Sequence, residues 1–157
     1  MTALRGLTLC VVASAAALAA SAVGGGAAAE DADAAAGLTV WDGVYPSAQA
    51  ERGLEIYDEF CVTCHARGMR GAPGSPPLTG APFLFNWDGR PLGALFEQVR
   101  DTMPVGQVGY LTDDELLDVI AAILAANGFP GDDGAADLTA DADALGAITI
   151  VRAEPEP

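Results

Sequence analysis

Three neighbouring side chains in the middle of the chain have the types and the spacing to hold a metal cofactor. Cys61 and Cys64 are separated by two residues, and His65 follows directly. Two thiols at this spacing can add to the two vinyl groups on one edge of a haem, and the adjacent imidazole then supplies a nitrogen ligand to the iron. The sequence therefore predicts one haem c, attached covalently through Cys61 and Cys64 and ligated by His65.

Two other uses of these residues are weaker interpretations. A redox-active cysteine pair of the thioredoxin type is expected within a βαβ pattern, and the sequence has no such pattern. A structural zinc site requires four ligands, whereas only two Cys and one His follow residue 29.

A second iron ligand must be of another type, because the chain contains a single His. Met69 is only four residues from His65 and cannot readily reach the opposite face of a haem. Met103 lies 38 residues downstream of His65, and Pro104 restricts its backbone to an extended conformation. A thioether ligand raises the reduction potential of the iron, which suits electron transfer. We therefore predict Met103 as the ligand; as a mere core residue it would leave the iron open and reactive.

The segment between the haem motif and residue 91 contains further candidates. Residues 76–80 (Pro-Pro-Leu-Thr-Gly) lie where a backbone carbonyl can accept the Nδ1 proton of His65 and so fix the orientation of the ring. Trp87 has an indole N–H that needs an acceptor if buried; a haem propionate and simple core packing are equally good interpretations. Three arginines are candidates for neutralising a propionate, although surface charge is the favoured interpretation for each: Arg67, Arg70 and Arg90.

Helical periodicity of apolar residues places three helices around these candidates. The pattern predicts helices at about 47–60, 91–101 and 113–126. The Gly- and Pro-rich segment 67–90 is predicted to be irregular, and so long a loop in a small domain is expected to wrap around something.

Local signals define the ends of the predicted helices. Ser47 is the expected N-cap of the first helix, and Pro91 suits the first turn of the second. Thr112 and Glu115 form a Thr-x-x-Glu capping box before the third.

The N-terminal region has the composition of an export signal. Arg5 precedes an apolar Ala/Leu/Val-rich run over 7–23, and Ala27 to Ala29 offer small residues for cleavage. We therefore predict a signal peptide over residues 1–29, which would remove Cys10, and a periplasmic location. An uncleaved membrane anchor is the alternative, although the run is short and Ala-rich.

The rest of the chain divides by composition. Residues 30–37 are predicted to be a flexible acidic linker, 38–130 the compact domain, and 131–157 an acidic tail. The tail is either disordered or a strap packed on the domain through four apolar residues: Leu138, Leu145, Ile148 and Ile150.

The charge balance limits the partners. Acidic residues outnumber basic ones by 22 to 7, which gives a net charge of −15. Binding to a nucleic acid backbone requires a basic face, so nucleic acid partners are excluded. We expect a protein partner with a basic or apolar rim, and no stable membrane insertion once the signal is cleaved.

At this point the chain resembles the class I c-type cytochromes over about residues 41–129. Residues 61–65 and 102–104 match the haem and Met ligand motifs of that family, and 76–80 resembles its Pro-x-Leu-x-Gly segment, which implies the Pro76 carbonyl as the partner of His65. The spacing of Gly53, Tyr57 and Cys61 is similar to the family's first helix. The resemblance implies an all-α fold, with three to four helices around one covalently bound haem c and the first and last helices crossing closely at Gly53. The chain departs from the family at Ala122, where the last helix usually carries an aromatic residue, and Phe129 or the tail is the expected replacement.

A narrower resemblance concerns the partners. Residues 40–45 and 86–90 are similar to segments of small bacterial cytochromes associated with quinoprotein dehydrogenases. This implies an electron carrier that cycles between Fe(III) and Fe(II), takes electrons from a redox protein such as a quinoprotein dehydrogenase, and passes them to a respiratory acceptor. The alternatives are a cytochrome subunit held tightly in a dehydrogenase complex and, less well supported, a peroxidase-like haem enzyme. For Trp41 and Tyr45 themselves, packing of the N-terminal segment is the favoured role.

Overall fold

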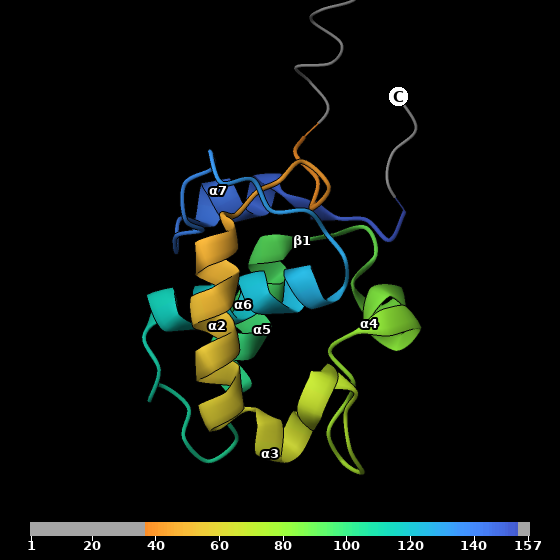
Figure 1. The fold of residues 1–157 in the computed structure, drawn as a ribbon, viewed down its shortest axis with the longest axis vertical. Helices are drawn as coiled ribbons and strands as arrows, with labels where there is room; N and C mark the ends of the chain where they lie inside the picture. The colour runs from red at the N-terminus through yellow and green to blue at the C-terminus, as the bar shows by residue number, and fades with distance from the viewer. Residues whose placement is uncertain (1–36, 154–157) are drawn as a thin grey trace, which may run out of the picture.

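The computed structural model describes residues 37–153, and this part of the chain is predominantly helical (Figure 1). The predicted signal peptide, Cys10 and nearly all of the predicted linker lie outside the described residues. Two two-residue strands form the only sheet within 37–153. The elements in chain order are α2 (Ser47–Phe60), α3 (Val62–His65), the 3-10 helix η1 (Arg67–Met69), α4 (Gly80–Trp87), β1 (Arg90–Pro91), α5 (Leu92–Thr102), α6 (Asp113–Ala126), α7 (Ala142–Ala147) and β2 (Thr149–Ile150).

The predicted ranges of the first and third helices are confirmed by α2 and α6, but the capping role predicted for Ser47 and the first-turn position predicted for Pro91 are wrong. Ser47 is the first residue of α2 and caps nothing; its backbone N–H donates to Asp133 Oδ1 at 3.1 Å. Pro91 lies outside α5, because it pairs with Thr149 in the small sheet, and α5 begins one residue later.

The capping box at the start of α6 is present as predicted. The Thr112 hydroxyl accepts from the Glu115 N–H at 3.3 Å, and the Glu115 carboxylate accepts from the Thr112 N–H at 2.8 Å. The hydrogen bonds from the backbone N–H and the hydroxyl of Thr112 lower the pKa of Glu115, because they stabilise the charged form.

The segment predicted to be irregular contains a helix that sequence reasoning missed. Residues 80–87 form α4, which buries Phe83 and partly buries Leu84 and Trp87. Gly80 and Pro82 obscured its periodicity, although Pro is tolerated in the first turn of a helix, where no backbone donor is lost.

The core is built on a close crossing of α2 and α6 (Figure 1). A Cβ atom at Gly53 would lie 1.7 Å from the carbonyl oxygen of Asp118, so only glycine allows the two backbones to approach this closely. Ala122 is buried on α6, and Phe129 beyond the helix is also buried. The ring of Phe129 packs edge-on against Trp41, with ring centroids 5.0 Å apart.

Residues 131–153 pack onto the helices as a strap. All four apolar residues named above for this segment are buried, with exposed fractions between 0% and 7%. The buried side chain of Gln49 donates to the Leu138 carbonyl at 3.1 Å and accepts from the Leu138 N–H at 2.8 Å, which fixes the strap to α2. Of the two alternatives for the tail, the described part adopts the strap, so the compact region extends beyond residue 130.

The strap also joins the two ends of the described chain. β2 pairs antiparallel with β1, and Thr149 forms a parallel bridge with Thr39 on its other side. Both ends therefore lie at the top of the view in Figure 1, while α3 lies at the bottom. Within residues 37–153, no helix has the length and apolar character needed to cross a membrane.

Candidate haem site

The end of α2 leads directly into the turn that carries the two cysteines. The Cys61 N–H donates to the Tyr57 carbonyl at 2.9 Å, and the Cys61 carbonyl accepts from the backbone N–H groups of Cys64 at 3.1 Å and His65 at 2.9 Å. Both sulfurs are free thiols; Cys61 is half-buried and Cys64 is exposed. The chain thus presents two thiols and an imidazole from a single helical turn.

The environment of Cys61 does not suit a redox-active thiol. Burial, followed by the neighbouring Cys64, raises the pKa of Cys61 to about 11. Thiols that exchange disulfides have lowered pKa values, because the thiolate is the nucleophile. The raised value, and the absence of a βαβ unit within 37–153, argue against a thioredoxin-like function.

His65 is buried and its ring is held by one hydrogen bond. Its exposed fraction is 8%, and Nδ1 lies 2.8 Å from the carbonyl oxygen of Pro76. A carbonyl oxygen can only accept, so Nδ1 carries a proton, and in the neutral ring Nε2 has a free lone pair. Imidazole binds a metal through one ring nitrogen while the other is bonded to a carbonyl, and this contact leaves Nε2 for that purpose.

The loop that carries the Pro76 carbonyl folds back on the haem motif through backbone hydrogen bonds. The Gly71 N–H donates to the His65 carbonyl, and the Leu78 N–H donates to the Met69 carbonyl, both at 2.8 Å. Gly71 has a φ of 76°, and a Cβ atom there would lie 2.6 Å from the backbone nitrogen of Pro77. Glycine at this position therefore allows the loop to return close enough for the contact with His65.

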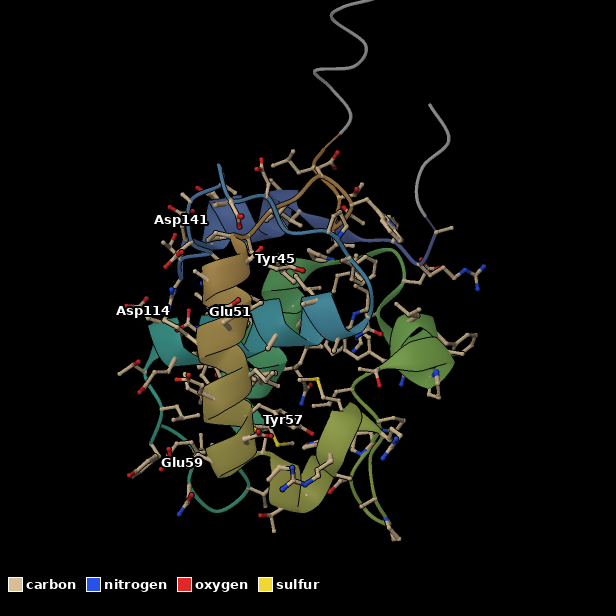
Figure 2. All side chains as sticks on the ribbon, viewed as in Figure 1. Tyr45, Glu51, Tyr57, Glu59, Asp114 and Asp141 are labelled. Atoms are coloured by element: carbon tan, nitrogen blue, oxygen red, sulfur yellow. The ribbon has the colours of Figure 1, made fainter. Side chains whose placement is uncertain are left out.

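Tyr57 supports Ala66, the residue that follows His65. Sequence reasoning did not identify this role of Tyr57. Its hydroxyl donates to the Ala66 carbonyl at 2.7 Å, and Ala66 has a φ of 62°, a conformation that non-glycine residues rarely adopt. The tyrosine is 1% exposed, and burial raises its pKa to about 12. Figure 2 shows Tyr57 at the lower end of α2, on the side toward α3.

The two candidate methionines occupy different environments. Met69 is 2% exposed and lines a shallow cavity of about 270 Å³ together with residues of α2 and α6, among them Ala50, Leu54 and Ala122. Met103 is half-buried and follows α5 directly, where its N–H donates to the Val99 carbonyl at 2.8 Å. Its backbone is extended, with φ −123° and ψ 153°, as Pro104 predicts.

Trp87 lies at the end of α4 and is half-buried. The guanidinium of Arg90 stacks over its ring, with Cζ 4.2 Å from the ring centroid, and Phe83 lies 6.3 Å away by ring centroids. Among the described residues no hydrogen bond joins Trp87 or Met103 to the group formed by 61–65 and Pro76. The structure therefore brings the thiols, the imidazole and the Pro76 carbonyl together and places the other two candidates on separate elements.

The charge around the site differs from that of the whole chain. Between α3 and α5 the chain carries three arginines and one carboxylate, Asp88, although acidic residues dominate elsewhere. The labelled carboxylates on the front and left of Figure 2 come from α2, the start of α6 and the residue before α7: Glu51, Glu59, Asp114 and Asp141. The loop beside the haem motif is thus the least acidic part of the described chain.

The donor set of the described residues fits a haem. Within residues 37–153, no three His, Cys, Asp or Glu side chains are grouped to hold a metal ion. A haem iron needs only axial ligands from the protein, because the macrocycle supplies the other four. The described residues offer one imidazole held through Nδ1, two thiols beside it and a half-buried methionine directly after α5.

The comparison with protein families agrees with this chemistry. Residues 48–121, slightly less than half of the chain, match the model of the family described as cytochrome C oxidase, cbb3-type, subunit III. The matched range contains the Cys-x-x-Cys-His motif, the loop with Pro76, Met103 and the first part of α6. The match indicates a c-type cytochrome.

That class implies covalently bound haem c and haem-based electron transfer, so an electron carrier is indicated rather than an enzyme. Cytochrome c domains are typically exported. Comparison with curated proteins and with solved structures gave no match.

Proposed function

We propose that this cytochrome is a single-haem electron-transfer protein of class I, with haem c attached through Cys61 and Cys64 and with His65 and Met103 as the two iron ligands. When bound, the haem supplies an iron that accepts and releases one electron at a time. The observation that carries the proposal is the hydrogen bond from His65 Nδ1 to the Pro76 carbonyl, which leaves Nε2 free beside two free thiols.

The Pro76 carbonyl orients His65 for this role. The Pro76 carbonyl selects the tautomer, restricts rotation of the ring and increases the basicity of Nε2. Burial of the ring keeps water away from the ligand. Because the ring is already oriented, little has to reorganise when the iron changes charge.

Met103 is the proposed second ligand because it belongs to a stiff segment on another helix. The end of α5 anchors its N–H, and Pro104 keeps its backbone extended. Met69 is the less suitable thioether, since its side chain is buried against α2 and α6. A thioether stabilises ferrous iron, and a held thioether closes the coordination position that an enzyme would need.

Trp87 and Arg90 are proposed to face the haem propionates. Their stacked pair offers an indole N–H and a positive charge close together. Both groups hydrogen-bond well to carboxylates.

The proposed setting is the periplasm, after export directed by residues 1–29. A redox protein, such as a quinoprotein dehydrogenase, would be the donor, and a respiratory enzyme the acceptor. The alternative is a cytochrome subunit held tightly in a larger complex; in its favour, the matched family is described as a subunit of an oxidase. Co-purification of a partner after gentle extraction would separate the subunit from the free carrier.

A matched pair of variants tests the ligands. Met103→Leu and Met69→Leu each remove one thioether and keep similar side-chain volume. We expect Met103→Leu to lower the reduction potential and to allow carbon monoxide to bind, whereas Met69→Leu leaves both unchanged. Mass spectrometry of the wild-type protein should show one haem attached to the peptide containing Cys61 and Cys64. An unchanged potential and spectrum in Met103→Leu would overturn the ligand assignment.

A further inference from the structure

The residue that caps the C-terminus of α6, Asn127, is bonded to the loop that contains Pro76. Its amide nitrogen donates to the Leu78 carbonyl at 2.9 Å and to the Ile123 carbonyl of its own helix at 2.8 Å. Its amide oxygen accepts from the Gly80 N–H at 3.0 Å. One side chain thus bonds to two loop residues that flank Thr79, in the way that a neighbouring strand would.

The opposite side of the same loop is bonded to η1. The Leu78 N–H donates to the Met69 carbonyl at 2.8 Å, and the Thr79 hydroxyl donates to the same carbonyl at 3.3 Å. Residues 78–80 are therefore held between η1 and the end of α6. Asn127 is the only contributor from α6 to the hydrogen bonds of this segment among residues 37–153.

The position of Leu78 determines the position of the Pro76 carbonyl. Only Pro77 lies between them, and its ring fixes its φ angle near −65°. Because ψ of Pro77 is then the one soft torsion between the two peptide planes, a displacement at Leu78 is passed on to the carbonyl that accepts from His65. A hydrogen bond weakens steeply as its distance and angle depart from the optimum.

We propose that Asn127 is a positioning residue for His65: it holds the Pro76 carbonyl at the distance that sets the basicity of the imidazole and thereby the reduction potential. This inference rests on the proposed role of His65 as an iron ligand. A carbonyl bonded to Nδ1–H makes the imidazole a stronger donor to the metal, which favours ferric iron. Loss of Asn127 should weaken that bond and raise the potential.

The test compares two alanine variants at the two ends of α6 in the haem-loaded protein. Asn127→Ala removes the contacts with the loop, whereas Thr112→Ala removes the cap at the other end of the same helix and touches no residue of 76–80. Three quantities are measured: the reduction potential by spectroelectrochemical titration, the free energy of unfolding, and the exchange rate of the Gly80 amide proton by NMR.

We expect Asn127→Ala to have a higher reduction potential than the wild type. Its Gly80 amide proton should also exchange faster than the loss of overall stability alone would explain. Thr112→Ala should lose stability but keep the wild-type potential. A wild-type potential in Asn127→Ala, or the same shift in both variants, would overturn the inference. If Asn127→Ala fails to fold, Asn127→Ser gives the same test, because a hydroxyl can still cap the helix but cannot reach both loop residues.

Failure of this inference can be distinguished from failure of the proposed function. A wild-type protein without a His-ligated haem spectrum would overturn both. A wild-type protein with that spectrum, together with an unchanged potential in Asn127→Ala, would overturn the role of Asn127 alone.

Discussion

Replacing Gly53 by alanine should damage the fold more than the same change at any other glycine of the described chain. The added Cβ would lie 1.7 Å from the carbonyl oxygen of Asp118, 2.2 Å from its carbonyl carbon and 2.8 Å from the nitrogen of Val119. Ordinary van der Waals contact begins at 3.4 Å. All three atoms belong to the backbone of α6, so no side-chain rotation can relieve the overlap.

The cost follows from the separation that the methyl group imposes. The Asp118 oxygen alone requires α2 and α6 to move apart by about 1.7 Å, which is the difference between ordinary contact at 3.4 Å and the 1.7 Å found here. A gap of that size forfeits most of the dispersion attraction at the crossing, and comparable losses of core packing cost about 2–5 kcal/mol. The gain in helix propensity from Gly to Ala offsets about 1 kcal/mol. The expected net loss is about 1–4 kcal/mol, a large part of the stability of a typical domain.

Chemical denaturation of the haem-loaded protein, followed by far-UV circular dichroism, measures this loss. Gly146→Ala is the matched control, because Gly146 is also helical and a Cβ there would meet no heavy atom within 4 Å. We expect the control to be neutral or more stable by up to about 1 kcal/mol. A free energy of unfolding for Gly53→Ala within about 0.5 kcal/mol of the wild type would refute the close crossing.

Two further predictions concern the strap and the acidic helix start. Gln49→Ala leaves the N–H and carbonyl of Leu138 without their buried partners and should lower the free energy of unfolding by about 2–4 kcal/mol. The control is Gln98→Ala, at an exposed position. An equal loss of stability in the two variants would contradict this reasoning. Because the pKa of Glu115 is lowered from 4.5 in the folded state, its contribution is present above pH 4.5 and lost as the pH falls through the lowered value. Glu115→Gln should therefore flatten the decline of stability below pH 4.5 in acid titrations, and an unchanged slope would show that the Thr112 contacts do not stabilise the carboxylate.

The sequence predicted the features that depend on local pattern. The bounds of α2 and α6 follow from apolar periodicity and, for α6, from a capping box whose two partners are three residues apart. A carbonyl partner for His65 within residues 76–80 was predicted as well, and the resemblance of this segment to the Pro-x-Leu-x-Gly segment of class I cytochromes implied Pro76.

Features that depend on tertiary contacts were not predictable in the same way. The helix α4 contains Gly80 and Pro82, which weaken any local helical signal, and it forms around the buried Phe83. The sequence did not decide between a strap and a disordered tail, because the apolar residues alone do not reveal the two hydrogen bonds between Gln49 and Leu138. The role of Asn127 had no local signal at all, since its partners lie 47 and 49 residues earlier in the chain.

The pairing of Thr39 with Thr149 has a practical consequence for electrochemistry. Because both ends of the described chain lie in the upper part of Figure 1, away from α3, a linker fixed at either end would tether the molecule on the side opposite α3. The turn bearing Cys64 would then face the solution. A layer of molecules tethered to an electrode in this way should exchange electrons poorly with the electrode but readily with a dissolved redox protein. Tethering through the α3 turn should reverse that preference.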